Sequence, residues 1–182
     1  MNAQAPASYQ VYFETTKGPF VMQVVREWAP RGADRFFNLV QHGYYDGAYF
    51  FRVEPGFVVQ FGLAADPAVS SVWRGQRLQD DPVVQSNHRG YVSFASAGPD
   101  TRTAQIFINL SDNAALDAQG FAPFARIAEG LAVVDSLYAG YGGGAGFSPG
   151  PDQGRILAEG SAYLERDFPL LDEILSARVI AD

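Results

Sequence analysis

The sequence predicts a mainly β protein, built as a closed antiparallel barrel with two helices. Apolar and polar residues alternate in many short segments, only two segments have the spacing of an amphipathic helix, and strands and helices do not alternate as in a doubly wound sheet. With 182 residues, 47% hydrophobic and 18% charged, the chain is long enough for one globular domain. We expect residues 1–8 to form a flexible tail and residues 9–182 to form the single domain.

The first predicted elements are a β-hairpin and a helix. Apolar residues recur with a period of two over residues 9–14 and 20–24, and the turn-forming run Thr15-Thr16-Lys17-Gly18-Pro19 separates them. Pro30 suits the first turn of a helix, apolar residues then keep helical spacing, and Gly43 follows as a cap. A hairpin followed by one amphipathic helix is therefore expected.

The rest of the chain predicts further short strands and a second helix. Segments 50–62 and 94–107 are rich in Phe and Val, which favour strands. Helical spacing between flanking glycines predicts the second helix over residues 131–138, and residues 172–180 fit a closing strand. Residues 63–81 have no clear period, and we expect a long loop there.

A glycine-rich stretch, residues 141–150, follows the second predicted helix. The pattern Gly140-x-Gly142-x-x-Ala145 partly matches the fingerprint of dinucleotide-binding proteins. That fingerprint needs a strand before it and a further strand-helix unit after it, and neither is predicted at this point. We therefore favour a flexible loop over a phosphate site.

Composition argues against several classes of function. The net charge is −7 and the 13 Lys and Arg residues form no basic run, so we expect no nucleic-acid partner. The absence of cysteine excludes disulfides and thiolate metal sites, and with only two histidines, far apart in the sequence, we expect no metal. Neither histidine has a recognisable nucleophile partner, and no Gly-x-Ser-x-Gly motif occurs, so hydrolase chemistry has no support.

The sequence also bears on location. No apolar run approaches the ~20 residues of a membrane span, and the first residues lack the pattern of a signal peptide, so we expect no membrane association and a cytoplasmic protein. An Ala-x-Ala string within residues 3–7 leaves open the alternative of a periplasmic protein trimmed from an export signal.

Three hydrogen-bonding side chains, Arg52, Gln60 and Gln105, lie within the segments rich in Phe and Val. A buried polar group without a partner costs ~1–3 kcal/mol, and a charge costs more, so each must meet something polar. On these residues alone, an Arg52–Glu54 ion pair and backbone bonds to the glutamines would suffice. A polar ligand is the other possibility.

The segments Phe50–Gly62 and Tyr91–Ile108 resemble the signature stretches of the cyclophilins, the peptidyl-prolyl cis-trans isomerases. The likeness extends loosely from Val11 to about Tyr138, and the part after Gly150 is similar to a tail of bacterial members. The resemblance implies an eight-stranded barrel capped by two helices and catalysis of rotation about X-Pro bonds in protein substrates, which assists folding. It further implies proline-containing polypeptides as partners and no cofactor, and we expect a monomer.

The resemblance also implies a site. Arg52 would be the catalytic arginine, and Gln60 the amide that orients the substrate carbonyl. The implied substrate-binding residues are Phe57, Val58, Ala95, Ser96, Ala97, Gln105, Phe107, Leu116 and Phe121.

The reaction explains why such residues suffice. Rotation about a peptide bond passes through a twisted state with a barrier of ~18–20 kcal/mol, and in that state the proline nitrogen gains a lone pair. A fixed donor aimed at that nitrogen stabilises the twisted state more than either planar state, and this difference is what accelerates rotation. Arg52 is the natural donor, and no nucleophile or metal is required.

Three departures from the family pattern affect this site, one in the pocket and two at its rim. Val58 stands where many members have Met, and Ala115 stands where well-studied members have the Trp that binds cyclosporin, so we expect weak cyclosporin binding. The family's usual rim His is missing, and we expect Phe121 to fill its space. Because the rim differs, two alternatives stay open: a proline-peptide binding module or chaperone with little turnover and, less favoured, a barrel whose Arg52 is bonded internally.

Overall fold

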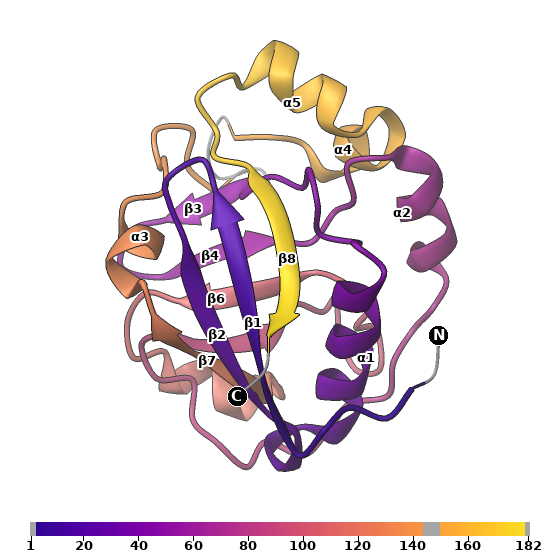
Figure 1. The fold of residues 1–182 in the computed structure, drawn as a ribbon, viewed down its shortest axis with the longest axis vertical. Coiled ribbons are helices and arrows are strands. Elements are labelled where there is room, and N and C mark those ends of the chain that lie inside the picture. Colours follow the sequence, from indigo (N-terminus) through magenta and orange to yellow (C-terminus); the bar gives the residue numbers. More distant parts are fainter. Residues whose placement is uncertain (1–2, 144–149, 181–182) are drawn as a thin grey trace.

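The computed structural model describes residues 3–143 and 150–180, which form one curled eight-stranded antiparallel sheet surrounded by helices (Figure 1). Neighbouring strands follow the order β3-β4-β6-β5-β7-β2-β1-β8. The strands are β1 (Ser8–Thr15), β2 (Phe20–Val25), β3 (Arg52–Glu54), β4 (Val58–Phe61), β5 (Tyr91–Phe94), β6 (Ile106–Asn109), β7 (Pro123–Glu129) and β8 (Ile174–Ile180).

Helices occupy the connections between the strands. Two 3-10 helices and five α-helices occur in the described ranges: η1 (Arg26–Trp28), α1 (Pro30–Gln41), α2 (Pro67–Arg74), η2 (Ala114–Gln119), α3 (Leu131–Asp135), α4 (Gln153–Glu159) and α5 (Ser161–Asp167). None of these helices is long and apolar enough to cross a lipid bilayer.

The predicted hairpin and first helix are confirmed. In the β1–β2 pair, Phe13 lies opposite Phe20, and the Thr15 hydroxyl donates to the carbonyl of Gly18 at 2.6 Å, which closes the turn. Helix α1 begins at Pro30, as expected from the missing N–H of proline. The second predicted helix is confirmed but is shorter, ending at Asp135.

Ten of the fourteen phenylalanines are buried and supply much of the core. Phe13 stacks on Phe20 at 4.7 Å between ring centroids, and Phe36 of α1 and Phe61 of β4 lie within 6.4 Å of Phe13. All four side chains are at most 1% exposed. The core therefore joins α1 to both halves of the sheet, β1–β2 and β3–β4.

The prediction of a fully closed barrel is corrected. In the described residues, the edge strands β3 and β8 do not pair with each other; the chain just before each of them does. Tyr49 and Glu173 form an isolated antiparallel bridge, flanked by backbone bonds of 2.8–3.0 Å between residues 47–50 and 172–174. Because β3 is only three residues long and β8 continues along β1, the two edges meet only at this short seam, and the sheet is curled but open beyond it.

The expectation of only two helices, and of a loop over residues 63–81, was wrong. Helix α2 lies inside that segment, and helices α4 and α5 follow residue 150. Asp66 and Asp152 start α2 and α4 by accepting a bond from a backbone N–H in the first turn, at 2.8 Å in both cases. All three helices have at most eight residues, too few to show a helical period.

Helices α4 and α5 build a second, smaller core beside the sheet, at the top of Figure 1. Ile156 of α4 and Leu164 of α5 pack with Phe51 and Leu63, which flank the β3–β4 hairpin, and all four are at most 5% exposed. The C-terminal helices are therefore attached to the part of the sheet that carries Arg52.

Two other predictions concern the N-terminal tail and the glycine-rich stretch. In the described part of the expected flexible tail, residues 3–5 lie along α1: the Ala5 N–H donates to Asp34 at 2.9 Å, and Asn38 bonds both backbone groups of Ala3. Ser8 already belongs to β1. The glycine-rich stretch lies largely, over residues 144–149, outside the described residues.

Candidate active site

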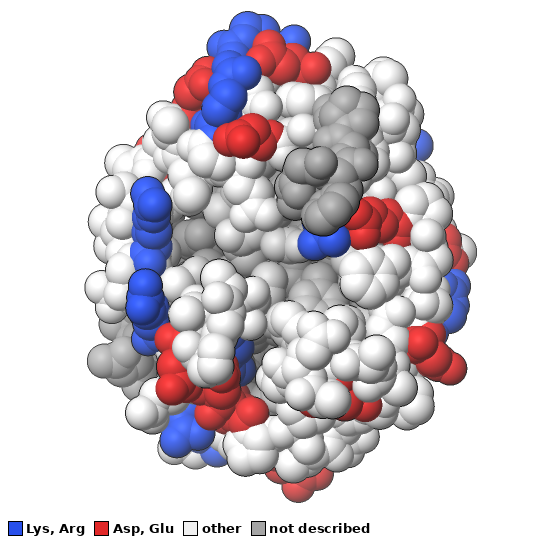
Figure 2. Space-filling view, turned by 180° about the vertical axis from the view of Figure 1, so that it is seen from behind, with Lys and Arg blue, Asp and Glu red and all other residues white. Residues whose placement is uncertain are grey.

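A cavity of about 360 Å³ opens where strands β3, β4 and β6 meet the segment after β5 and the η2 turn. On the face shown in Figure 2, a hollow is bordered mainly by uncharged residues, in keeping with a lining whose described residues include one charged side chain, that of Arg52. The cavity brings together every site residue expected from the sequence: Arg52, Phe57, Val58, Gln60, Ala95, Ser96, Ala97, Gln105, Phe107, Leu116 and Phe121.

A row of polar side chains crosses the cavity. Arg52 of β3 lies directly opposite Gln60 of β4 in the sheet register, and its Nη1 donates to Gln60 Oε1 at 3.1 Å. Gln60 Nε2 in turn donates to Gln105 Oε1 at 3.0 Å. Cross-strand pairing therefore places three residues, spread over 53 positions of the sequence, in one hydrogen-bonded line.

Arg52 has partners on the protein and also access to the cavity. Its Nη2 donates to Glu54 at 3.1 Å, the ion pair that the sequence allowed, while its side chain remains 26% exposed. The guanidinium lies 5.9 Å from the centre of the Phe57 ring, and within the described ranges its buried Nε has no hydrogen-bond partner. Glu54 and Gln60 thus hold the guanidinium at the edge of the cavity without enclosing it.

An apolar floor lies next to the polar row. Val58 and Phe107 are at most 5% exposed, and Leu116 from η2 completes this side of the cavity. Phe121 meets Phe107 edge to face at 5.5 Å between centroids and lines the cavity beside it. Such a floor can bind an apolar ring, because aromatic faces exclude water and add contact area.

The segment after β5 forms the opposite wall. The Ala95 N–H donates to the Gln105 carbonyl at 2.9 Å, and the Ala97 N–H donates to the Thr101 hydroxyl at 2.8 Å. Small side chains at 95–97 leave the backbone close to the cavity. The sequence did not point to three further lining residues, Thr101, Thr103 and Gln153.

Buried amides beneath the cavity hold its rim. Asn109 and Asn87 are fully buried, and Asn87 Nδ2 donates to the Phe121 carbonyl at 2.9 Å and to Asp117 at 2.7 Å. Asn113 Nδ2 donates to the Phe57 carbonyl at 2.9 Å. Our sequence reasoning missed this network, although amides beside buried strands were a usable signal because buried amides need partners.

Asp117 fastens the η2 turn to this network. Burial alone would raise the pKa of its carboxyl, but hydrogen bonds from Ser86 and Asn87 outweigh burial and lower the pKa below its ordinary value. A lowered carboxyl pKa contributes stability above the unfolded-state pKa of about 3.9, and this stability is lost as the pH falls through the folded-state value.

We therefore expect Asp117→Asn to lower the free energy of unfolding by about 1 kcal/mol at pH 7, since charge-assisted bonds are replaced by neutral ones. The difference from wild type should shrink as the pH falls from about 3.9, the unfolded-state pKa, through the lowered folded-state pKa, because the wild-type carboxyl then loses its charge. Urea unfolding at several pH values measures it; a difference that stays constant from pH 7 to pH 2 would contradict the assignment.

The chemistry of the cavity suits a ligand with both an apolar ring and a planar amide. Hydrogen-bonding groups of Arg52, Gln60 and Gln105 face the floor of Val58 and Phe107 across one hollow. Within the described ranges, no cluster of three or more His, Asp or Glu side chains could hold a metal ion. The arrangement places hydrogen-bond donors and an apolar surface in one cavity on a curled antiparallel sheet.

Comparisons with known proteins agree with this arrangement. The sequence model of the family described as cyclophilin type peptidyl-prolyl cis-trans isomerase/CLD matches residues 10–151. Peptidyl-prolyl cis-trans isomerase ppi1 of Schizosaccharomyces pombe is 35% identical over 127 residues, 68% of this chain and 81% of that protein. Peptidyl-prolyl cis-trans isomerase-like 1 of human is 32% identical over 144 residues, 75% of this chain and 86% of that protein.

Solved structures show the same fold. A cyclophilin type peptidyl-prolyl cis-trans isomerase of Cryptosporidium parvum matches with a TM-score of 0.70 at 20% identity, over 96% of this chain and 99% of that one. A second structure, described as the same protein in the presence of the dipeptide Ala-Pro, matches with a TM-score of 0.67.

The chain therefore belongs to the cyclophilin-type peptidyl-prolyl cis-trans isomerase family, enzymes that rotate X-Pro peptide bonds. The similar proteins named above come from a yeast, an animal and a protozoan, so the expected likeness to bacterial members gains no support from them.

Proposed function

We propose that the cavity binds proline-containing polypeptides and that Arg52 catalyses rotation of the X-Pro bond in them, which would assist the folding of client proteins. The observation that carries this proposal is the row Arg52–Gln60–Gln105 beside the apolar floor. An X-Pro segment needs both: an apolar surface for the ring and donors for the amide.

Binding would proceed on the floor of the cavity. The proline ring would lie against Val58, Phe107 and Leu116, with Phe57 and Phe121 at its sides. A wall that removes water from the amide weakens its polar, resonance-stabilised form, which lowers the barrier to twisting. The C. parvum protein crystallised in the presence of Ala-Pro has the same fold, which supports a ligand of this class.

Orientation would come from the amides. Gln60 is 7% exposed and bonded on both sides, to Arg52 and to Gln105, so its side chain is fixed before a substrate arrives. A fixed amide can hold the carbonyl on one side of the X-Pro bond while the other side turns. The backbone of residues 95–97 would pair with the peptide on the opposite wall.

Catalysis would come from Arg52. Its guanidinium is held by Glu54 and Gln60 while part of it faces the cavity, so it can donate to the proline nitrogen as that nitrogen becomes pyramidal. A charged hydrogen bond is worth ~1.5–3 kcal/mol, or about one to two decades of rate.

The same bonds favour a second candidate function, a binding module with little turnover. Arg52 already bonds to two side chains, and a donor that binds the planar and twisted states equally well gives affinity without acceleration.

Exchange spectroscopy by NMR on a short Ala-Pro peptide separates the two functions, with an Ala-Ala peptide of the same length as a binding control. We expect the protein to bind the proline peptide and to accelerate its cis-trans exchange, and to bind the control at least tenfold more weakly, because the control lacks the ring that fills the floor. Binding without acceleration would establish the binding module. If the protein neither bound the peptide nor accelerated its exchange, the proposed site would be rejected.

A further inference from the structure

We propose that Arg102, which is buried and does not line the cavity, is a positioning residue that sets the wall of the peptide site. This inference rests on the proposed function, because it concerns the wall of that same site. The wall formed by residues 95–97 is backed by the segment Thr101–Gln105, which leads into β6 and bonds to it at Ala95 and Ala97. We refer to Thr101–Gln105 below as the wall.

Side chains alternate in direction along this wall. Thr101, Thr103 and Gln105 line the cavity and are half-buried, whereas Arg102 and Ala104 between them are buried on the other side. Whatever fixes Arg102 therefore fixes the backbone that presents its two threonine neighbours to a peptide.

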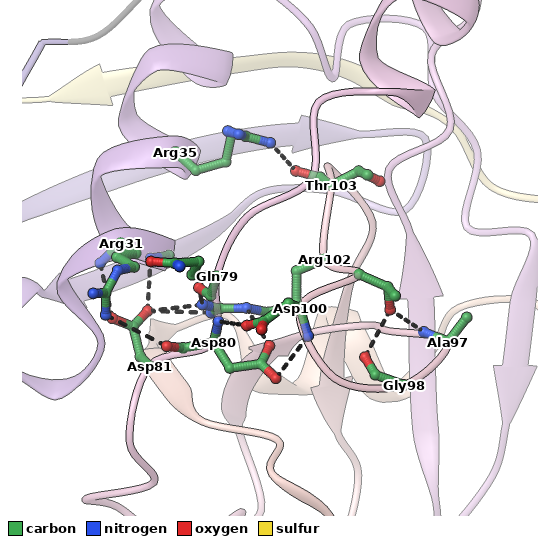
Figure 3. Close-up of polar contacts among 12 residues, drawn as sticks. Arg31, Arg35, Gln79, Asp80, Asp81, Ala97, Gly98, Asp100, Arg102 and Thr103 are labelled. Carbon is green, nitrogen blue, oxygen red and sulfur yellow. Dashed lines mark hydrogen bonds and ion pairs between the residues drawn. The ribbon is translucent and has the colours of Figure 1, made fainter.

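Arg102 is held by a buried ion pair. Its side chain is 4% exposed, and both Nη atoms lie 3.2 Å from Asp81 Oδ2, whose own side chain is 1% exposed. Its Nε lies 3.2 Å from Asp80 Oδ1, and its Nη2 donates to the Gln79 carbonyl. Figure 3 shows the guanidinium among these three consecutive residues. A planar guanidinium with several donors is fixed in direction as well as in place.

Asp81 connects this pair to helix α1. Its carboxylate accepts bonds from the backbone N–H of Arg31 at 3.1 Å and of Gly32 at 2.9 Å, in the first turn of the helix. A second arginine of the same helix also bonds the wall: Arg35 Nη1 donates to the Thr103 carbonyl at 2.8 Å (Figure 3). The wall is thus attached to α1 at two successive residues, Arg102 through Asp81 and Thr103 directly.

Further hydrogen bonds connect the wall to the rim of the cavity. The Thr101 hydroxyl donates to the Gly98 carbonyl at 2.7 Å and accepts from the Ala97 N–H, and Ala97 itself lines the cavity. Asp80 and Asp100 each accept a bond from the other's backbone N–H, at 3.0 and 2.7 Å. The position of the whole segment from Ala97 to Gln105 therefore depends on the ion pair between Arg102 and Asp81.

This arrangement predicts which step of the reaction Arg102 affects. Arg102 is buried on the side of the wall away from the cavity, and Arg52 itself bonds to Glu54 and Gln60 and not to the wall. Loss of Arg102 should therefore misplace the groups that hold the peptide and leave the catalytic donor in place. Peptide affinity should fall, while the exchange rate of bound peptide should not. A purely structural role would change stability alone.

The test uses the proline peptide and the wild-type chain beside Arg102→Met and Arg102→Lys. NMR titration gives the dissociation constant, and exchange spectroscopy at saturating peptide gives the rate on the enzyme. We expect Arg102→Met to raise the dissociation constant at least tenfold with the bound-state rate within twofold of wild type. Arg102→Lys, which keeps the charge but loses the planar fork, should raise it about threefold.

Asn38→Ala is the matched control for stability. Asn38 is a buried polar residue of the same helix that bonds the backbone of Ala3 and lines no part of the cavity. It should lower the denaturation midpoint and leave the dissociation constant unchanged.

An unchanged dissociation constant in Arg102→Lys and Arg102→Met, or an equal rise in Asn38→Ala, would overturn the inference. If Arg102→Met does not fold, the lysine variant decides alone. Failure of the wild-type chain to bind or accelerate the peptide would reject the proposed function instead.

Discussion

Replacing Arg52 with alanine is expected to slow the catalysed cis-trans exchange of a bound proline peptide at least tenfold while the protein stays folded. Among the described residues, the guanidinium is the one charged donor that lines the cavity. Its loss removes the proposed bond to the proline nitrogen, which strengthens in the twisted state. A bond worth ~1.5–3 kcal/mol corresponds to about ten- to a hundredfold in rate. Peptide affinity should change far less than the rate, because the floor of Val58 and Phe107 is untouched.

Two variants separate this effect from a general disturbance of the polar row. Arg52→Lys keeps a positive charge but cannot donate to Gln60 and to the substrate in the fixed fork geometry, so we expect part of the rate to be lost. Glu54→Gln removes the ion-pair partner of Arg52 but no lining group of the cavity, and it should change the rate less than threefold. NMR exchange measures all three variants. A Glu54→Gln loss as large as that of Arg52→Ala would mean that the ion pair, and not the donor, determines the rate.

Replacing Gly62 with alanine is expected to cost about 3 kcal/mol of folding stability. Gly62 follows β4 with φ of +107°, and a Cβ placed there would lie 2.6 Å from the Ala104 carbonyl oxygen and 2.9 Å from the Gln105 Cα. The positive φ costs an alanine ~1 kcal/mol, and forcing the two backbones apart adds about 1–3 kcal/mol. Urea unfolding measures the sum.

Gly56→Ala is the matched control for the backbone term. Gly56 also has a positive φ, +75°, but a Cβ there would meet nothing within 4 Å, so its substitution should cost only ~1 kcal/mol. Because the clash at Gly62 displaces Gln105, Gly62→Ala should also weaken peptide binding, whereas Gly56→Ala should not. Equal costs for the two substitutions would show that the backbones yield without strain.

Most of the site could be predicted because its residues lie in short, specific stretches. Arg52 and Gln60, eight positions apart, lie opposite each other in one hairpin, so both side chains are on the same side of the two-stranded ribbon. The sequence also indicated that the polar side chains need hydrogen-bond partners, since unpaired donors among Phe and Val are costly. It could not identify those partners, because whether Gln60 bonds the backbone or Gln105 depends on the register of β4 against β6.

The short helices and the wall of the site were beyond sequence reasoning for a different reason. Helix α2 has eight residues, and its stability depends on packing and on the Asp66 cap more than on its own pattern. Arg102 would be read as an exposed loop cation. Only the fold brings Asp81, 21 positions earlier, to its guanidinium.

The position of β8 at the edge of the sheet limits how the chain can be shortened. The family match ends at residue 151, yet β8 pairs along β1, and α4 covers Phe51 and contributes Gln153 to the cavity. A fragment that stopped at the end of the match would leave the outer edge of β1 without a partner and Phe51 uncovered. Unpaired strand edges beside exposed apolar surface recruit other chains, so such a fragment would aggregate instead of folding as a smaller isomerase.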